Sequence, residues 1–470
     1  MLQGAYVVVD IGKTLSKVTL WSPEGRVLDR QTRSNDKCAS DGIRRLDVNG
    51  IATWLVDALS KYREESVCAI IPVGHGAGVA AIADDMLAFA PLDYEQPIPS
   101  EVMSAYRAER DAFAATGSPA LPDGLNLGSQ LFWLEQLYPE AMRKAVFVPW
   151  AQYWTWFLTG TAVSEATSLG CHTDLWAPET ASFSPMAQRL GWAERFGPLA
   201  KAGDVVGALR PQLAAQTGLS PDTVVLAGLH DSNAALLAAR GFPEIADNEA
   251  TVFSTGTWFI AMRLAAGHVP IAQLSEARDT LINVDAYGSP IASARFMGGR
   301  EIESVIEIDT RRVDIKPDQP ALLAAVPDLI ARGTMLLPTL APGCGPFPGG
   351  RGTWLDLPLD WDENWHARRA AVCLYAALVA DTALDLIGSK ARLLVEGRFA
   401  EAEVFVRALA ALRPDTQVFV ANAHNDVSFG ALRLINPQLM PQGGLVQVAP
   451  LEGDLADYRR RWTAALGVPA

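Results

Sequence analysis

Residues 6–21 read YVVVDIGKTLSKVTLW. The run Tyr6–Val9 is short, apolar and β-branched, which predicts a strand, and Lys17–Trp21 predicts a second strand after a turn that contains Gly12. A further turn at residues 23–25 leads into a third strand that begins at Val27. We therefore expect a β-meander with a glycine at its first tip, rather than a strand followed by a helix.

A similar pattern occurs near the middle of the chain. Thr251–Ser254 predicts a strand, Thr255–Thr257 contains a glycine, and Trp258–Met262 predicts the returning strand. We interpret this likeness as a weak internal repeat. It predicts two α/β domains, residues 1–244 and residues 245–470, each with a mixed sheet flanked by helices, and an interdomain cleft.

Composition limits the classes of function. The chain has 470 residues, 49% of them hydrophobic and 20% charged, which is enough apolar material for large cores. Its net charge of −14 makes binding to nucleic acid unexpected, because a phosphate backbone requires a basic surface. An anionic small molecule is still compatible, since a local site can be positive inside an acidic protein.

The cysteines and the N-terminus indicate the compartment. The five cysteines are scattered without a Cys-x-x-Cys pair, which argues against a disulfide framework or a zinc knuckle. Charged residues stand at positions 10 and 13, where a signal peptide needs its apolar segment, and no run of about 18 apolar residues occurs. We expect a cytoplasmic protein without a membrane span.

The two glycine-containing tips suggest phosphate binding. A glycine lets backbone N–H groups approach an oxyanion closely, because no Cβ intervenes. At the first tip, Thr14 and Ser16 add hydroxyl donors, while Lys13 and Lys17 add positive charge. Residues 255–257 offer the same chemistry without a charge. Two such tips facing each other would clamp a polyphosphate; taken singly, each is equally well explained as an ordinary hairpin turn.

Other nucleotide-binding motifs are missing from the sequence. It contains no Gly-x-x-x-x-Gly-Lys-[Ser/Thr] and no Gly-x-Gly-x-x-Gly; residues 74–78, GHGAG, do not match that spacing. This argues against dinucleotide-dependent oxidoreductases. Asp10, at a strand end beside the first tip, could hold Mg²⁺, which uses one or two carboxylates together with phosphate oxygens. Alternatively, it is a turn-forming Asp.

Asp231 is the second carboxylate of interest. It follows a predicted strand at 224–226 and His230, and it precedes a predicted helix at 232–240. A carboxylate at such a junction can accept the proton of a hydroxyl that attacks a γ-phosphate. The alternatives are a helix N-cap for Asp231 and a packing role for His230. The aromatic segment 132–157 is mostly core, although some of its rings could wall a sugar pocket to which Glu165 adds a polar group.

Taken together and in order, these motifs resemble the FGGY family of carbohydrate kinases. Residues 10–17 (DIGKTLSK) resemble its first phosphate motif, 228–231 (GLHD) its catalytic segment, and 254–258 (STGTW) its second phosphate motif. Gly397, after Val395 and Glu396, stands where the adenosine motif lies, and residues 422–431 resemble the loop and helix that follow it. The sequences STGTW and HDS resemble the rhamnulose and fuculose kinase branch.

The resemblance implies an actin-like, ribonuclease H-like ATPase fold that uses ATP and Mg²⁺. It implies Asp231 as the catalytic base and Asp10 as the residue near the metal. The implied nucleotide-binding residues are Gly12, Lys13, Thr14, Ser16, Lys17, Thr255, Gly256, Thr257, Gly397, Arg398 and Asn422. The implied substrate-binding residues are His75, Gly76, Glu165 and His230. Three features depart from the family pattern. Lys13 replaces a small residue, Arg398 with Phe399 stands where a glycine run is usual, and residues 295–300 (RFMGGR) lie in the region where the rhamnulose-kinase pattern has a Lys-Asn pair.

The function that the resemblance implies is ATP-dependent phosphorylation of a terminal hydroxyl on a small sugar, such as the ketoses L-rhamnulose or L-fuculose. The alternatives are a kinase for another pentulose or a polyol, a sensor of the same fold that binds nucleotide without kinase activity, and a hydrolase or phosphatase that uses the same carboxylates. A small-molecule sugar is the expected partner, and a homodimer is left open.

Overall fold

The structure is a computed structural model that describes residues 4–40, 42–310, 312–359, 361–422 and 426–467. By its internal contacts the chain divides into two compact units. The first comprises the described residues up to Gly241, the segment Ile282–Pro290 and the segment that carries helix α16 (Val427–Leu432); the second comprises the remainder. The predicted boundary after residue 244 places the two later segments in the second domain instead.

The first unit is built on a mixed sheet that includes the predicted meander. β1 pairs antiparallel with β2, with Asp10 opposite Lys17, and β2 pairs antiparallel with β3. β1 also pairs parallel with β6, on its other side. The strands, in sheet order, are β14 (Val205–Ala208), β15 (Val224–Leu226), β6 (Val67–Gly74), β1 (Ala5–Ile11), β2 (Leu15–Trp21) and β3 (Val27–Ser34), and β16 (Leu229–His230) pairs with the end of β6.

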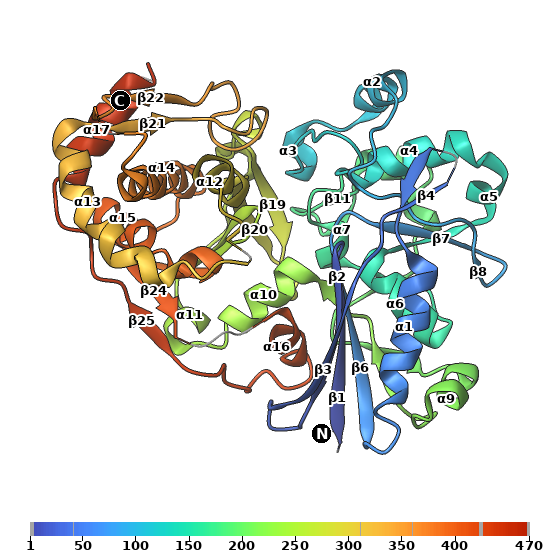
Figure 1. Cartoon of the computed structure of the whole chain (residues 1–470). Helices are drawn as coiled ribbons and strands as arrows, with labels where there is room; N and C mark the ends of the chain where they lie inside the picture. The colour runs from blue at the N-terminus through green and yellow to red at the C-terminus, as the bar shows by residue number, and fades with distance from the viewer. Residues whose placement is uncertain (1–3, 41, 311, 360, 423–425, 468–470) are drawn as a thin grey trace. The chain divides into compact units, whose positions relative to one another are not determined.

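Every residue of β1 is buried, because helices cover both faces of its sheet. Val7 and Val9 pack with α1 (Val48–Ser60), which is N-capped by Asp47. Tyr6 and Val8 pack with residues of α10 (Asp231–Ala239) and α16. The alternation follows from the two-residue period of a strand. Figure 1 shows α1 lying beside this sheet and α10 next to α16.

A second layer of the first unit carries the aromatic segment. As expected, its rings are mostly core: Trp150, Tyr153 and Trp154 are buried and contact one another. The helix that carries them, α6 (Trp150–Thr159), ends at Gly160, whose φ of 86° suits glycine. The other helices are α2 (Ser100–Glu109), α3 (Phe113–Thr116), α4 (Leu127–Leu137), α5 (Pro139–Lys144), α7 (Ala166–Leu169), α8 (Pro185–Arg189) and α9 (Pro211–Thr217). The short strands are β4 (Cys38–Ser40), β5 (Ile43–Arg45), β7 (Val79–Ala83), β8 (Met86–Leu87), β9 (Val146–Pro149), β10 (Ser164–Glu165), β11 (Trp176–Ala177), β12 (Ser182–Phe183) and β13 (Leu199–Ala200).

The second unit repeats the hairpin, as the sequence predicts. β17 pairs antiparallel with β18 and parallel with β23, with Thr255 opposite Phe259 and Gly397. In sheet order the strands are β19 (Thr280–Val284), β20 (Pro290–Phe296), β18 (Phe259–Leu264), β17 (Ala250–Thr255), β23 (Arg392–Gly397), β24 (Gln417–Ala421) and β25 (Leu445–Gln447). A small hairpin is formed by β21 (Met335–Leu337) and β22 (Thr353–Leu355).

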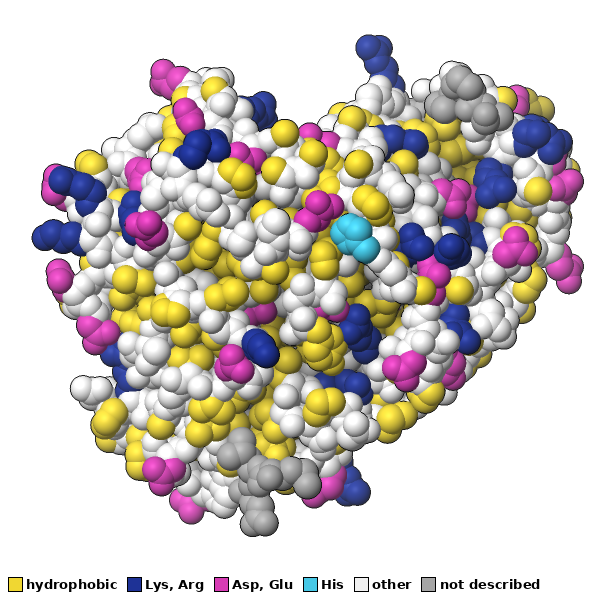
Figure 2. Space-filling model, turned by 180° about the vertical axis from the view of Figure 1, so that it is seen from behind, with side chains coloured by type: hydrophobic (Ala, Val, Ile, Leu, Met, Phe, Trp, Pro, Cys, Tyr) yellow, Lys and Arg dark blue, Asp and Glu magenta, His cyan; other side chains and the backbone are white. Residues whose placement is uncertain are grey.

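Helices surround the second sheet. They are α11 (Pro243–Ala246), α12 (Gly298–Ile306), α13 (Gln319–Arg332), α14 (Trp365–Leu386), α15 (Glu403–Leu412) and α17 (Leu455–Ala465), with the 3₁₀ turn η5 (Arg398–Glu401) after β23. Among the helices of the described residues, none combines the length and apolar character needed to cross a bilayer. On the face drawn in Figure 2, lysine and arginine side chains are interspersed with aspartate and glutamate.

Candidate functional site

The first tip, between β1 and β2, is a tight turn. Gly12 N donates to Leu15 O at 3.1 Å, and a Cβ on Gly12 would lie 2.9 Å from that carbonyl, so this position favours glycine. Asn35 supports the turn, because its Nδ2 donates to Gly12 O at 2.8 Å. Ser16 is buried and donates to Asn35 Oδ1, whereas Thr14 is exposed. Of the two predicted hydroxyl donors, only Thr14 is therefore presented to solvent, and Asn35 is a support that the sequence reasoning missed.

The lysines of this tip are already paired. Lys13 Nζ lies 2.8 Å from Asp93 Oδ1, 2.8 Å from Glu95 Oε2 and 4.1 Å from the centroid of the Tyr94 ring. Lys17 Nζ lies 3.3 Å from Asp10 Oδ2. Much of the positive charge expected at the tip is thus balanced within the first unit.

Asp10 is a buried carboxylate at the end of β1. Burial raises its pKa to about 6, against the attraction of Lys17, while Asp231 and Asp426 raise it further. Among the described residues, no group of three or more His, Cys, Asp or Glu side chains is arranged to hold a metal ion. Mg²⁺ uses one or two carboxylates completed by phosphate oxygens and water, so a single buried carboxylate beside a glycine-containing turn fits it.

Asp231 begins α10, directly after the short strand β16. Its Oδ1 accepts a hydrogen bond from Ser232 N at 2.6 Å and lies 3.1 Å from His230 Nε2. Its side chain keeps 32% of its surface exposed. Burial by itself raises the pKa of this carboxyl, but His230, His75 and the hydrogen bonds outweigh it and hold the pKa below its usual value. The carboxylate is therefore ionised at neutral pH and has an open side.

His230 is held from several directions. Its backbone N donates to Thr167 Oγ1 at 2.9 Å, and its Nδ1 lies 3.4 Å from Asn233 Nδ2. A Cβ on Gly76 would lie 2.8 Å from His230 Nε2, so the ring can stand where it does only because residue 76 is glycine. Asn233 was missed from the sequence, although the spacing of His230 and Asn233 at the start of a helix is one that brings side chains together.

Glu165, which was expected at the sugar pocket, caps a helix in the structure. It is 2% exposed, and its carboxylate caps α7 by accepting from Thr167 N at 2.9 Å and Ser168 N at 3.1 Å. It also accepts from Thr167 Oγ1 at 2.6 Å. Burial raises its pKa to about 7. The expected contact with a sugar is replaced by support for Thr167 and, through it, for His230.

His75 is a candidate ligand-binding residue, because its ring is buried and its nitrogens lack hydrogen-bond partners among the described residues. Neither ring nitrogen has a hydrogen-bond partner among the described residues, although the side chain is only 9% exposed. It stacks on Trp150, with centroids 5.7 Å apart, and meets the edge of Tyr94 at 5.3 Å. Burial lowers its pKa to about 4, so it is neutral at pH 7. Leaving such nitrogens unpaired is costly, which indicates that a ligand or water completes them.

A pocket of the first unit borders this region. It has an empty volume of about 420 Å³, and Gly12, Lys13 and Thr14 line it together with Asp93 and Trp150. Trp150, which lines this pocket, also stacks on His75, which is not itself a lining residue. The first unit therefore places polar, charged and aromatic groups around a common space.

The second tip, between β17 and β18, exposes one of its two predicted threonines. Thr255 is buried, donates to Glu396 O at 2.5 Å and accepts from Phe399 N at 3.2 Å. Thr257 is exposed, and so is Ser254, which was not among the predicted binding residues. A Cβ on Gly256 would meet nothing nearer than Trp258 O at 3.6 Å. Thr255 is therefore a brace between the tip and β23, because strand alternation turns its side chain inward.

At the end of β23, Gly397 is followed by Arg398 and Phe399 rather than by further glycines. Gly397 has a φ of 87°, and a Cβ there would lie 2.3 Å from Thr255 O, so this glycine permits contact with the second tip. Arg398 Nη1 donates to Glu303 Oε1 at 3.1 Å. The same Oε1 accepts from Thr310 Oγ1 at 2.6 Å. Arg398 is thereby tied to α12 and does not extend freely.

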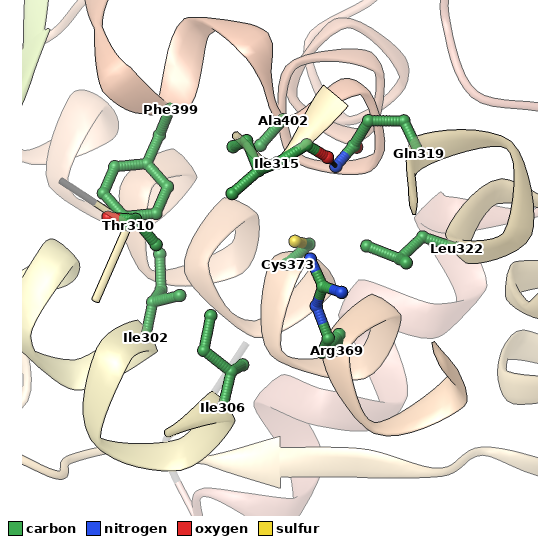
Figure 3. A pocket seen from close by; sticks show the side chains of 10 residues that line it. All are labelled: Ile302, Ile306, Thr310, Ile315, Gln319, Leu322, Arg369, Cys373, Phe399 and Ala402. Atoms are coloured by element: carbon green, nitrogen blue, oxygen red, sulfur yellow. Dashed lines mark hydrogen bonds between the residues drawn. The ribbon is translucent and has the colours of Figure 1, made fainter. Parts of the chain in front are cut away.

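A pocket lies beside this segment, with an empty volume of about 310 Å³. In Figure 3, Phe399, Thr310 and Ile302 stand on one side and Gln319 and Leu322 on the other. The remaining lining residues are Ile306, Ile315, Arg369, Cys373 and Ala402. The pocket is largely apolar, as a flat aromatic base requires.

Asn422 is not among the residues that line this pocket. Its backbone N donates to Gly444 O at 3.1 Å, and its Oδ1 accepts from Gly444 N at 2.8 Å, where β24 and β25 meet. The side chain therefore fastens two strand ends. Residues 423–425, which belong to the segment that resembles a family motif, lie outside the described residues.

Comparisons with known proteins agree on one family. The model of the N-terminal domain of the FGGY family of carbohydrate kinases matches residues 101–238, and that of the carbohydrate kinase FGGY C-terminal domain matches residues 247–442. A carbohydrate kinase from Novosphingobium aromaticivorans has a solved structure with 68% identity and a TM-score of 0.93, over 98% of this chain and 99% of that one. No curated protein matches.

More distant structures share the fold. A ligand-bound xylulose kinase from Lactobacillus acidophilus has 13% identity and a TM-score of 0.80, over 99% of this chain and 98% of that one. Plasmodium falciparum glycerol kinase with ADP has 12% identity and a TM-score of 0.80, over 98% of both chains. The predicted two-domain, actin-like α/β fold is thus confirmed.

Proposed function

The chain belongs to the FGGY family of carbohydrate kinases, and we propose that it transfers the γ-phosphoryl group of ATP to a terminal hydroxyl of a small ketose, such as L-rhamnulose or L-fuculose. The observation that carries the proposal is the ionised carboxylate of Asp231, open on one side, with the unpartnered ring of His75 within its electrostatic reach. One group accepts a proton, and the other offers hydrogen bonds to sugar hydroxyls.

On the acceptor side, Asp231 takes the proton of the attacking hydroxyl as the oxygen forms its bond to the γ-phosphorus. The bond from phosphorus to the bridging oxygen of ADP breaks in the same transfer. Phosphoryl transfer depends mainly on positioning and electrostatic stabilisation. Accordingly, His75, Trp150 and Tyr94 form the wall that positions the sugar and excludes water.

On the donor side, the second unit supplies an uncharged tip and an apolar pocket. We place the phosphates against Gly256 and the exposed hydroxyls of Ser254 and Thr257, and the adenine in the pocket beside Phe399. Continuity supports this, because Gly397 contacts Thr255 on one side and leads to Phe399 on the other. Mg²⁺, when bound, supplies positive charge that offsets the charge developing on the phosphate oxygens, and Asp10 is the residue that would hold it.

A second candidate is a kinase for another pentulose or for a polyol. It is favoured by the folds of the xylulose kinase and glycerol kinase structures, which resemble this chain over nearly its whole length. A sensor without kinase activity and a phosphate-releasing hydrolase remain the alternatives in which no sugar is phosphorylated.

A coupled assay of ADP release tests the proposal. Purified protein receives ATP and Mg²⁺ with L-rhamnulose, L-fuculose, D-xylulose, glycerol or gluconate, and a parallel sample receives no acceptor. We expect ADP release to depend on a ketose. Release with glycerol alone would favour the polyol reading, phosphate release without acceptor would favour hydrolysis, and ATP binding without any release would favour a sensor.

A further inference from the structure

Two consecutive contacts connect a buried amide to the carboxylate of Asp231. Asn233 Nδ2 lies 3.4 Å from His230 Nδ1, and His230 Nε2 lies 3.1 Å from Asp231 Oδ1. Asn233 is 1% exposed and His230 is 7% exposed. The three residues come from one short stretch, β16 and the first turn of α10. The series of contacts is thus shielded from water up to the carboxylate itself.

The chemistry of these groups fixes the direction of the hydrogen bonds. An ionised carboxylate can only accept, so His230 Nε2 must carry the hydrogen that faces Asp231. In a neutral imidazole, Nδ1 then holds a lone pair and needs a donor. The Nδ2 amide of Asn233 supplies it. With a neutral ring and the Asn233 amide nitrogen facing Nδ1, only the tautomer protonated at Nε2 satisfies both contacts.

We propose that His230 and Asn233 are positioning residues for the proton-accepting step, with Asn233 fixing the His230 tautomer whose Nε2–H occupies Asp231 Oδ1. The proposal rests on the proposed function of Asp231 as the base. Because Oδ1 already accepts from His230 and from Ser232 N, its capacity is taken up. Oδ2 is left as the oxygen that receives the acceptor hydroxyl.

The surroundings hold this arrangement rather than compete with it. Thr167 Oγ1 accepts from the backbone N of His230, and the missing side chain of Gly76 leaves room for the ring. The titratable groups that act on Asp231 from neighbouring elements are His75 on the loop after β6, Asp10 on β1 and Tyr94. Among these groups, only His230 hydrogen-bonds to the carboxylate in the structure.

The tautomer can be measured without any substrate. In ¹⁵N-labelled, ligand-free protein, we expect the His230 ring to show a protonated Nε2 and an unprotonated Nδ1 at pH 7.5, and we expect Asn233→Leu to weaken that preference. A doubly protonated ring would mean that the Asn233 amide is turned to present Oδ1, and a protonated Nδ1 alone would break the contact with Asp231. Either result overturns the proposal while leaving Asp231 as the base untouched.

Kinetics then test the consequence. His230→Gln keeps an N–H at the place of Nε2, whereas His230→Leu removes it. We expect His230→Leu to lower kcat roughly 10- to 100-fold and to move the acid limb of the kcat/KM profile to higher pH by about one unit, since Asp231 loses the group that favours its ionised form. His230→Gln should recover most of both effects, and KM for ATP should stay unchanged in both variants.

Asn126→Leu serves as the matched control, because Asn126 is another buried, hydrogen-bonded asparagine of the same unit. It should lower stability without moving the acid limb. If His230→Gln and His230→Leu behave alike, or if the acid limb stays in place, His230 has only a structural part. If Asp231→Asn is fully active, the proposed function itself fails, which is a separate result.

Discussion

Six strands of each sheet have the same order and the same directions, whereas β19 beside β20 and β16 beside the end of β6 have no counterpart in the other sheet. A hairpin is followed by a third antiparallel strand on one side and, on the other, by two parallel strands and an antiparallel edge strand. The corresponding pairs are β1 and β17, β2 and β18, β3 and β20, β6 and β23, β15 and β24, and β14 and β25.

The two tips differ in charge. In the first unit, Asp10 lies on β1 and forms an ion pair with Lys17, which lies opposite it on β2. In the second unit, the acid, Glu396, stands on the parallel strand opposite Ser254, and its carboxylate has no hydrogen bond or ion pair with a described side chain. One fold thus supports a charged site suited to proton and metal chemistry and a neutral turn suited to holding phosphate by backbone groups.

The largest effect that distinguishes the units is expected at Asp231. Asp231→Asn should keep the fold and lower kcat roughly 10²- to 10⁴-fold, because the amide cannot accept the proton. Steady-state ADP release measures it. The control is Asp454→Asn, which alters the N-capping aspartate of α17 in the second unit and should leave kcat unchanged. Near wild-type turnover of Asp231→Asn would remove the assignment.

Gly256 probes the second tip. In the free protein a Cβ there meets only Trp258 O at 3.6 Å, so Gly256→Ala should leave Tm nearly unchanged. If phosphate approaches the backbone, the methyl group should raise KM for ATP roughly 10-fold or more, by the loss of one or more close contacts. The matched variant is Gly299→Ala, whose Cβ would lie 2.0 Å from Gly256 O and which should lower Tm instead. Unchanged ATP affinity in Gly256→Ala contradicts the placement.

Lys13 tests whether the first tip binds phosphate through charge. Lys13→Met leaves the carboxylates of Asp93 and Glu95 facing each other without the ammonium, so we expect a loss of stability of about 1–3 kcal/mol and a change in KM for ATP below about threefold. Thermal unfolding and KM measurements check both. A tenfold rise in KM for ATP with unchanged stability would restore the phosphate contact that the sequence predicts.

The smallest effect is a pH-dependent one in the second unit. Burial raises the pKa of Glu396 from 4.5 to about 8. Between those values the folded protein keeps a proton that the unfolded chain releases, so stability falls as the pH rises through this window. Glu396→Gln removes the penalty, and we expect its Tm to exceed that of the wild type by roughly 2–6 °C at pH 8.5 and to equal it near pH 4.5. Glu401→Gln, at an exposed ion pair with Lys316, should show no such difference.

Local patterns predicted the two hairpins and the helix that follows Asp231 because their signals lie within a few residues: β-branched runs, a glycine turn and a junction between a strand and a helix. They could not assign the inward or outward face of single hydroxyls. Ser16 and Thr255 were both expected at a ligand and are both buried. The ion-pair partners of Lys13 could not be predicted from local patterns either, since Asp93 and Glu95 lie 80 residues or more further along the chain.

Within the site, residues tied to a motif were easier to find than those that support it. His75, His230 and Asp231 follow strand ends and were named from the sequence. Asn35 carries no motif, and its importance comes from hydrogen bonds to residues of the first tip, more than 20 positions away in the sequence. Whether the named residues bind as expected stays a prediction, as does the cleft between the domains.

Helix α16 has a consequence for biosynthesis. Phe429 and Leu432 complete the core around Tyr6 and Val8, and Phe429 lies 6.0 Å from Trp21, ring centroid to ring centroid. Gly430 is so close to α10 that a Cβ would lie 1.7 Å from Ala234 O. A nascent chain must therefore be synthesised beyond residue 432 before β1 and β2 are fully covered, and chaperones have that interval in which to protect them.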